Sequence, residues 1–207
     1  MKISCMKGKL MQGISNVSKA VSTKTTHPIL SCIFIEAENG NIKLTANDME
    51  IGIESYVEGT VIEEGKVAIE AKLLSDIVRK LPDSEIHMET NEDFKTTIKC
   101  EKSLFTIAGK SGEDFSSLPV VEKSKYITIS QFTLREIINQ TIFSISDSEY
   151  NNVMTGELFE VSNNRLRVVA IDGHRIAIRN VELKDESQDV KVIVPGKALS
   201  YISKIVN

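Results

Sequence analysis

Two apolar runs that flank Asp172-Gly173 form the clearest hydrophobic pattern in the chain. Residues 168–171 precede this pair, residues 174–178 follow it, and both runs contain β-branched side chains. An Asp-Gly pair between such runs is typical of a β-hairpin, because it readily takes the positive φ angles of a two-residue turn. The pattern therefore predicts two antiparallel strands joined at Asp172-Gly173.

The same pattern occurs earlier in the chain, where residues 46–48 match residues 170–172 at a separation of 124 positions. The match runs back to Ile3 without a gap and, after one extra residue, forward to Ile77. A repeat of this length is long enough to bury a core of its own. It therefore predicts two similar domains rather than a solenoid.

Within each copy, the periodicity of apolar residues predicts the order strand, helix and three strands. This β-α-β-β-β unit occurs twice in the first copy and once in the second, and the chain ends inside a fourth unit. The order predicts an α+β fold with the helices on one face of antiparallel sheets. The predicted strands are 2–6, 29–37, 41–46, 49–58, 67–70, 84–90, 94–100, 103–108, 126–129, 153–160, 165–171, 174–182 and 190–194, and the predicted helices are 7–20, 71–81, 131–146 and 196 onward.

A linker separates the two copies. Residues 109–125 are rich in Ser, Gly and charged residues and contain Pro119, which is typical of a domain boundary. We expect domains at 1–120 and 121–207. The last three strands of the second domain are absent by comparison with the first, so we expect a longer parent protein.

Composition narrows the class of protein. Apolar residues make up 41% of the chain and Trp is absent, so the cores are built mainly from Ile, Val and Leu. No apolar run is long enough to span a membrane and no signal peptide is visible, so we expect a cytoplasmic protein. Cys5, Cys32 and Cys100 are scattered, and His27 and His87 are isolated. We expect no disulfide framework, no metal site and no cofactor.

Charge is unevenly distributed although the net charge is only −4. The four predicted helices carry nine Lys or Arg residues against Asp76 and Glu136. Lys is a good helix former on solvated surfaces, which is the simpler explanation for any one helix. The same bias on all four helices predicts a basic face that contacts phosphates without reading sequence. The candidate DNA-binding helix residues are Lys72, Arg79, Lys80, Arg135, Lys197 and Lys204.

Several stretches carry a family resemblance: residues 26–30 (THPIL), 44–50 (LTANDME), 114–115 (DF), 118–119 (LP), 155–160 (TGELFE), 170–177 (AIDGHRIA) and 192–195 (VIVP). Together they resemble the bacterial DNA polymerase III beta subunit, or sliding clamp, family. The resemblance covers the chain in order. It implies tandem DNA-clamp domains, of which this chain supplies the first and part of the second, while the third domain is absent.

In that family, a ring-forming homodimer encircles double-stranded DNA and binds the polymerase and the clamp loader through short linear peptides. The resemblance implies a non-catalytic processivity factor for DNA replication. It adds Lys24 and the loop at 148–153 to the DNA contacts, although Asn151 and Asn152 replace the Arg or Tyr of many relatives. The implied peptide-binding residues are Met154, Ile171, Gly173, His174, Arg175 and Ile176. The implied subunit interface consists of Leu73, Ile77, Phe105 and Ile107, and without a third domain we expect no closed ring.

Two other functions remain open from the residues alone. A hydrolase would use Asp172 and His174, but no nucleophile or third catalytic group accompanies this pair. A structural repeat protein would bind no ligand at all. Turnover that is lost in His174→Ala would favour the hydrolase, and the absence of salt-sensitive DNA binding would favour the structural protein.

Overall fold

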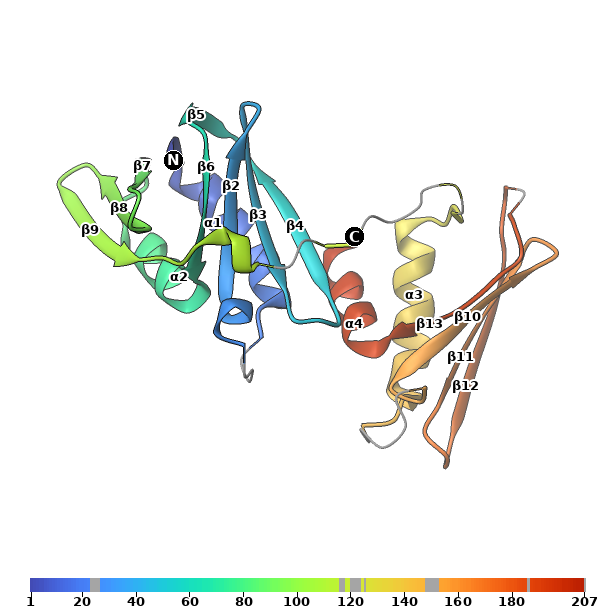
Figure 1. The fold of residues 1–207 in the computed structure, drawn as a ribbon. Helices are drawn as coiled ribbons and strands as arrows, with labels where there is room; N and C mark the ends of the chain where they lie inside the picture. The colour runs from blue at the N-terminus through green and yellow to red at the C-terminus, as the bar shows by residue number, and fades with distance from the viewer. Residues whose placement is uncertain are drawn as a thin grey trace. The chain divides into compact units, whose positions relative to one another are not determined.

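The computed structural model describes residues 1–22, 27–115, 118–119, 124, 126–147, 153–185 and 187–206. They belong to two compact units, Met1–Pro119 (unit 1) and Val120–Asn207 (unit 2). Both units combine antiparallel sheets with helices (Figure 1). The predicted α+β class is therefore confirmed.

Unit 1 contains two sheets. Its strands are β1 (Lys2–Met6), β2 (Cys32–Glu38), β3 (Asn41–Asn47), β4 (Gly52–Val57), β5 (Gly59–Glu63), β6 (Gly65–Glu70), β7 (Glu85–Thr90), β8 (Lys95–Cys100) and β9 (Ser103–Ala108). Its helices are α1 (Lys7–Val17) and α2 (Ala71–Lys80), with short 3-10 helices η1 (Ser18–Ala20), η2 (Pro28–Ser31) and η3 (Gly112–Asp114). One sheet has the order β4-β3-β2-β6 and the other the order β5-β1-β7-β8-β9.

Unit 2 contains one sheet with two helices. Its elements are α3 (Gln131–Thr141), η4 (Ile142–Ser144), β10 (Gly156–Ser162), β11 (Arg165–Ile171), β12 (Ile176–Glu182), β13 (Val190–Pro195) and α4 (Gly196–Ile205). The strand order is β12-β11-β10-β13. Each of these strands is the repeat counterpart of one strand in the sheet β4-β3-β2-β6, and the spatial order is the same.

The two four-stranded sheets also share their hydrogen-bond register, which confirms the repeat. A one-residue slip would turn every side chain to the opposite face of the sheet, so an equal register places equivalent residues on equivalent faces. The equivalent cross-strand pairs include Phe34–Thr45 and Leu158–Val169, Ala46–Ile53 and Ala170–Ala177, and Phe34–Ala68 and Leu158–Ile193.

Helices α1 and α3 form where the sequence predicts them, but both are shorter as α-helices. Leu10, Ile14 and Val17 lie three or four residues apart on one face of α1, and all three are fully buried. The α-helix ends at Val17 and continues as η1, where the Ser18 hydroxyl donates to the Ile14 carbonyl over 2.6 Å. In unit 2, α3 likewise ends at Thr141 and continues as η4.

Strand β5 was not predicted, because the predicted strand 49–58 ends where β5 begins. Glu58 alone separates β4 from β5, yet these strands belong to different sheets. Gly59 permits the crossing, since a Cβ at this position would lie 2.5 Å from the Ser4 carbonyl oxygen of β1. The pairing of β1 with both β5 and β7 also ties the first repeat unit to the second.

Several other predicted strands begin later in the structure, and one does not form. Residues 29–31 belong to η2, which begins at Pro28, and β2 starts only at Cys32. Residues 126–129 form no strand. Their counterpart β1 pairs with β5 and β7, whereas no described strand of unit 2 pairs with residues 126–129.

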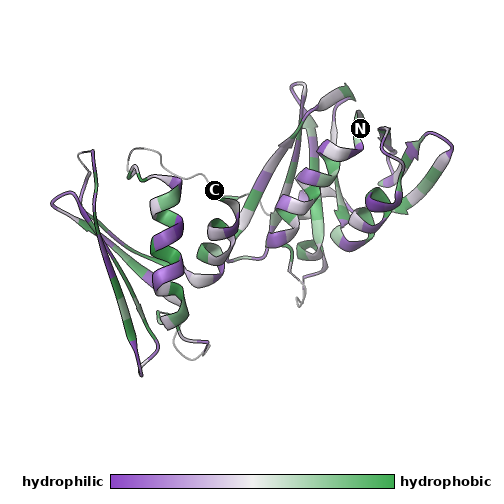
Figure 2. Cartoon of the chain, turned by 180° about the vertical axis from the view of Figure 1, so that it is seen from behind, coloured by the Kyte–Doolittle hydropathy of each residue, from purple (hydrophilic) through white to green (hydrophobic). Residues whose placement is uncertain are grey.

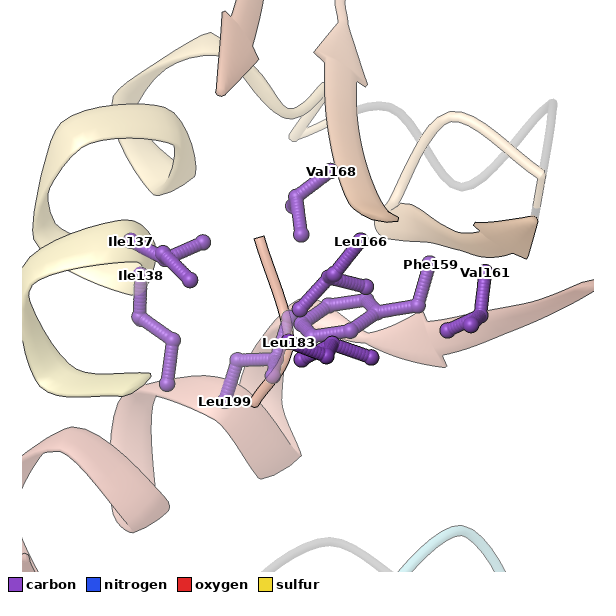
Figure 3. Packing of buried hydrophobic residues seen from close by; sticks show 8 residues of the cluster. All are labelled: Ile137, Ile138, Phe159, Val161, Leu166, Val168, Leu183 and Leu199. Carbon is purple, nitrogen blue, oxygen red and sulfur yellow. The ribbon is translucent and has the colours of Figure 1, made fainter. Parts of the chain in front are cut away.

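The core of unit 2 lies between the sheet and the two helices. Ile137 and Ile138 of α3 and Leu199 of α4 meet Phe159 and Leu166 of the sheet (Figure 3). Burying one such aliphatic side chain contributes about 1.5–3 kcal/mol. Apolar and polar residues are interspersed along α1 and α3 (Figure 2), with apolar residues three or four positions apart, as an amphipathic helix over a core requires.

Candidate functional site

The β11–β12 hairpin brings five of the six predicted peptide-binding residues close together, and Met154 lies outside the hairpin. Ile171 and Ile176 pair across the two strands, and both are exposed, at 38% and 58%. The loop from Asp172 to Arg175 joins them, so Gly173, His174 and Arg175 project from the same tip. Met154 lies before β10, where its carbonyl accepts a hydrogen bond from Ser146.

The backbone at the centre of the turn differs from the prediction, which expected positive φ angles at both Asp172 and Gly173. Gly173 has a positive φ of 89°, whereas Asp172 does not. The Asp172 side chain instead closes the turn, because its Oδ1 accepts from the backbone N–H groups of His174 and Arg175, each over 2.9 Å. These hydrogen bonds, that of His174 foremost, hold the pKa of Asp172 below its usual value.

The Arg175 side chain contacts Asp172 and Phe143 of unit 2. Its Nε donates to Asp172 Oδ2 over 2.7 Å, and its guanidinium carbon lies 5.8 Å from the centroid of the Phe143 ring. Phe143 belongs to η4 and is 57% exposed. It was not predicted as a site residue, because nothing local in the sequence connects it with a residue 32 positions away.

An apolar row continues from this hairpin across the outer face of the sheet, the face opposite α3. Cross-strand pairing places Ile178 beside Val169, Val169 beside Leu158, and Leu158 beside Ile193. Ile178 is 54% exposed and Ile193 45%. This row was not predicted, although apolar residues on both faces of these strands were a visible signal in the sequence. The apolar surface is therefore larger than expected.

The predicted DNA-binding cations that the structure describes all lie on helix surfaces and are exposed. Arg79 forms an ion pair with Asp76 at 3.2 Å in α2. Within the described part of the chain, Lys72, Lys80 and Arg135 form no ion pair. Exposed side chains are found at Lys72, Arg79, Lys80, Arg135, Lys197 and Lys204.

Not every Lys side chain on the helices is free to contact DNA phosphates. Lys7 Nζ donates to the Leu81 carbonyl, and Lys9 pairs with Glu58 at 2.9 Å. These two side chains tie α1 to neighbouring elements of unit 1, so the bias toward cations has a structural component on that helix. Lys24 and residues 148–152 of the predicted DNA-binding loop lie outside the described residues.

The predicted interface residues cluster around one edge of unit 1. Strand β9 is an edge of its sheet. Leu73 and Phe105 are each 40% exposed, whereas Ile77 and Ile107 are buried at 8% and 7%. Two of the four side chains are therefore partly exposed, and the other two are buried in unit 1.

A buried polar cluster in unit 2 was not anticipated. Glu157 of β10 is fully buried, and its Oε2 accepts from the Thr141 hydroxyl over 3.0 Å. Its Oε1 and the buried Ser144 hydroxyl have no hydrogen-bond partner among the described residues. Burial raises the pKa of Glu157 to about 7, and the hydrogen bond from Thr141 opposes this rise.

Unit 1 has a cavity of about 550 Å³ on the outer face of its four-stranded sheet. Phe115 forms part of its wall and stacks on Phe34, with ring centroids 5.0 Å apart. Lys43 bridges Glu36 and Glu54 beneath it, at 2.7 and 3.4 Å. None of the predicted site residues lines this cavity.

The described residues form neither a candidate metal site nor a membrane-spanning helix. No group of three or more His, Cys, Asp or Glu side chains in that part of the chain is placed to hold a metal ion. Cys5, Cys32 and Cys100 are free and buried, and burial raises the pKa of Cys5 to about 11. No helix in the same ranges is long and apolar enough to cross a membrane.

Two family models match the chain. The model of the DNA polymerase III beta subunit, N-terminal domain, matches residues 1–119, and that of the central domain matches residues 128–207. Unit 1 and most of unit 2 are thus matched in order. The chain belongs to the DNA polymerase III beta subunit family.

Individual relatives agree with this assignment. The beta sliding clamp of Halalkalibacterium halodurans is 38% identical over 208 residues, which cover 95% of this chain and 55% of that protein. A crystal structure from Eubacterium rectale, assigned to the DNA polymerase III beta subunit, has a TM-score of 0.96 and 56% identity and covers 100% of this chain and 56% of its own. The DNA polymerase sliding clamp of Bacillus subtilis has a TM-score of 0.95 and 32% identity, with 100% and 57% coverage. The chain spans about half the length of these relatives.

Proposed function

We propose that this chain acts as part of a DNA sliding clamp, a non-catalytic processivity factor that encircles duplex DNA for the replicative polymerase in the cytoplasm. The observation that carries the proposal is the match of both units, in order, to the domains of one clamp family. The exposed cations on α2, α3 and α4 support it independently, because an acid-poor helix surface suits a phosphate backbone.

In this role, Lys72, Arg79 and Lys80 of α2 contact phosphates, with Arg135 of α3 and the cations of α4 (Lys197 and Lys204) adding further contacts. Lys24 would join them. Contacts to phosphates carry no sequence information, so binding is independent of base sequence. Phe132 of α3 is 66% exposed, whereas α2 carries no aromatic residue. With roughly four to six phosphates neutralised, the slope of log K against log salt is about −4 to −5.

The test is a salt titration of duplex DNA binding with a charge-matched pair of variants. Replacing Lys72, Arg79 and Lys80 by Gln should weaken binding and reduce the slope by about one for each phosphate that is no longer neutralised. The control replaces Lys95, Lys99 and Lys102 by Gln, which are exposed cations on and beside β8. Equal losses of affinity in both triple variants, or a strong preference for one duplex sequence at fixed salt, would contradict the proposal.

The hairpin tip of unit 2 serves as one wall of a groove for short linear peptides from polymerase and loader. Ile171 and Ile176 supply an apolar floor, Met154 borders it, and Gly173, His174 and Arg175 form its polar end. Exposed apolar residues beside an Arg suit a peptide with aliphatic or aromatic anchors and an acidic or amide neighbour. Ile171→Asp should abolish binding of such a peptide, whereas Ile62→Asp, an exposed apolar position of unit 1, should not.

The edge of unit 1 around β9 serves as the contact surface of a ring-forming homodimer. Leu73 and Phe105 make the contact, because they are exposed, whereas Ile77 and Ile107 are buried within unit 1. A long apolar edge strand is normally covered in a soluble protein. Without a third domain, the 207-residue chain is expected to close no ring, so sedimentation of this chain with and without Phe105→Asp tests whether the open edge associates at all. A stable dimer that is retained on circular DNA and released by linearisation would contradict this expectation.

The hydrolase alternative finds little support at the hairpin. Asp172 directs both carboxylate oxygens to its own turn and to Arg175, and among the described residues no hydrogen bond joins it to the His174 ring. A general base needs an orienting partner for its imidazole. Hydrolysis of nucleotides, esters or peptides that is lost in His174→Ala would overturn the non-catalytic assignment.

A further inference from the structure

Arg175 is held on two sides in unit 2. Its Nε is bound by Asp172 Oδ2 at 2.7 Å, and the Phe143 ring lies beneath its guanidinium plane at 5.8 Å. The side chain nevertheless remains 58% exposed. Among the described residues, no hydrogen bond reaches its two terminal amino groups. The guanidinium is thus oriented, while its outer edge is left available.

Unit 1 provides an internal control for this arrangement. Asp48 closes the equivalent turn, where its Oδ1 accepts from the backbone N–H groups of Glu50 and Ile51 over 3.1 and 2.8 Å. Ile51 occupies the position of Arg175 in the repeat, and Lys19 the position of Phe143. The turn therefore forms without an arginine. The second carboxylate oxygen of Asp172 and the ring of Phe143 serve a feature that unit 2 alone has.

We propose that Asp172 and Phe143 are positioning residues that hold Arg175 so that its terminal amino groups present paired donors to a carboxylate of a bound peptide. This inference rests on the proposed peptide-binding role of the hairpin. Arg recognises carboxylates through two parallel N–H donors, and a guanidinium whose Nε is already bound offers its outer pair. Fixing the side chain in advance lowers the entropy lost when the peptide binds.

The surroundings favour an acidic residue next to apolar anchors. Ile171 and Ile176 lie directly beside Arg175 in the hairpin and are partly exposed. A carboxylate that binds Arg175 therefore places its neighbouring residues over these two side chains. The carboxylate comes from an Asp or Glu side chain or from the peptide's own C-terminus, and both present the same chemistry.

The test uses the 207-residue chain and labelled, C-terminally amidated octapeptides in which one Asp is moved through the positions around a Leu-Phe pair. Each peptide has a twin with Asn in place of Asp, and binding is measured by fluorescence anisotropy at pH 7.5. At the best position, wild type should prefer the Asp peptide by about 10-fold, the value expected for a charge-assisted pair. Arg175→Gln should reduce the ratio to about one.

The positioning residues are tested by the same ratio. Asp172→Asn keeps the Oδ1 that closes the turn but removes the carboxylate that binds Nε, and Phe143→Leu removes the ring. Each should lower the ratio to about 3-fold or less, because Arg175 remains but is no longer fixed. Asp48→Asn makes the same chemical change in the equivalent turn of unit 1, where Ile51 stands in the place of Arg175. It should leave the ratio as in wild type.

A readout that needs no peptide separates this inference from the proposed function. In ¹H–¹⁵N spectra, the Arg175 Nε–H should exchange slowly in wild type and rapidly in Asp172→Asn, and its ring-current shift should vanish in Phe143→Leu. Failure of every peptide to bind, with these signals present, would refute the peptide-binding role itself. Normal peptide binding with an unchanged Asp/Asn ratio in both variants would refute the positioning role. Equal binding by a non-amidated peptide without Asp, lost in Arg175→Gln, would support it with the chain end as the carboxylate.

Discussion

Units 1 and 2 carry different kinds of side chain at three equivalent buried positions, two at the ends of helical segments and one on a strand of the sheet. The positions hold Val17, Ala20 and Ile33 in unit 1 and Thr141, Ser144 and Glu157 in unit 2. All six residues are almost completely buried. Their environment is therefore similar in the two units, while the side chains change from apolar to polar. The fold tolerates a carboxyl group in its core where a hydroxyl donor accompanies it.

The difference shows that the fold requires these three positions to be buried but does not require their side chains to be apolar. Burying a carboxyl group disfavours its charged form unless hydrogen bonds compensate. In unit 2, Thr141 supplies one such hydrogen bond, and the raised pKa of Glu157 shows that the compensation is incomplete. Apolar side chains at these positions are therefore sufficient for the fold, and the polar set of unit 2 lowers its stability near neutral pH.

The largest effect is expected from moving the carboxyl group into unit 1. Ile33→Glu should destabilise unit 1 by about 4 kcal/mol or more, because Val17 and Ala20 offer no donor to the buried group. Urea denaturation followed through the methyl resonances of Ile14 and Ile35 reports unit 1 by itself. Ile33→Leu, the control, should cost less than about 1.5 kcal/mol. Similar losses of stability in the two variants would mean that water reaches this position.

The second prediction concerns pH. Glu157 titrates near 4.5 when unfolded and near 7 when folded, so between these values the folded state binds the extra proton. The contribution of Glu157 to the stability of unit 2 should therefore be greatest below pH 4.5 and fall by about 3 kcal/mol as the pH rises to 7, at about 1.4 kcal/mol per unit of pKa shift.

Glu157→Gln provides the control for this titration, because the amide keeps the shape of the side chain but has no proton to lose in this range. The Glu157-dependent fall should then disappear from the methyl resonances of Ile137 and Ile138. Those of Ile14 and Ile35 show how unit 1 responds to the same change of pH. A fall of equal size in Glu157→Gln would assign the pH dependence to another group.

The regular parts of the fold were predictable because they depend on local patterns. The apolar spacing of α1 and the alternation in β11 and β12 are set by residues a few positions apart. Because the two copies share the same pattern, a strand or helix predicted in one copy was also predicted in the other. Strand β5 was missed because its boundary depends on how closely Gly59 approaches β1, which is a tertiary contact.

The candidate site was predictable in part for the same reason. The hairpin residues from Ile171 to Ile176 are contiguous, so one motif predicted that they lie together at a turn, while their peptide-binding role stays a prediction from the resemblance. By contrast, the contact of Phe143 with Arg175 joins a 3-10 helix to a distant turn, and the burial of Glu157 depends on α3. Neither has a local signature. The polar or apolar character of a residue predicts its usual environment, and Glu157 lies in the opposite one.

The third prediction tests the donor that accompanies Glu157. Thr141→Val, which installs the residue type of Val17, removes the hydrogen bond to Glu157 Oε2. Above pH 7 the charged carboxylate then lacks this donor, and unit 2 should lose roughly 1–2 kcal/mol. At pH 5 the protonated carboxyl group needs it less, so the loss should be smaller. The same loss at both pH values would show that Thr141 contributes through its own bond to the Ile137 carbonyl.

The smallest effect is expected at the turns of the two equivalent hairpins. Met49 and Gly173 occupy matching positions, and both have a positive φ, at 76° and 89°. A Cβ at Gly173 would touch nothing within 4 Å, so Gly173→Ala tests backbone strain alone. It should destabilise unit 2 by about 1 kcal/mol, the usual penalty for the left-handed region.

Met49→Gly is the reverse change and should alter unit 1 by less than about 0.5 kcal/mol, because relief of strain is offset by the greater freedom of glycine in the unfolded chain. Both variants are measured by the same methyl-resolved denaturation. The Asp48 and Asp172 side chains close both turns by the same hydrogen bonds, so backbone strain is the variable that differs. If Gly173→Ala had no effect, the side chain of Asp172 would be sufficient to hold the turn, and glycine at this position would serve close approach by a ligand instead.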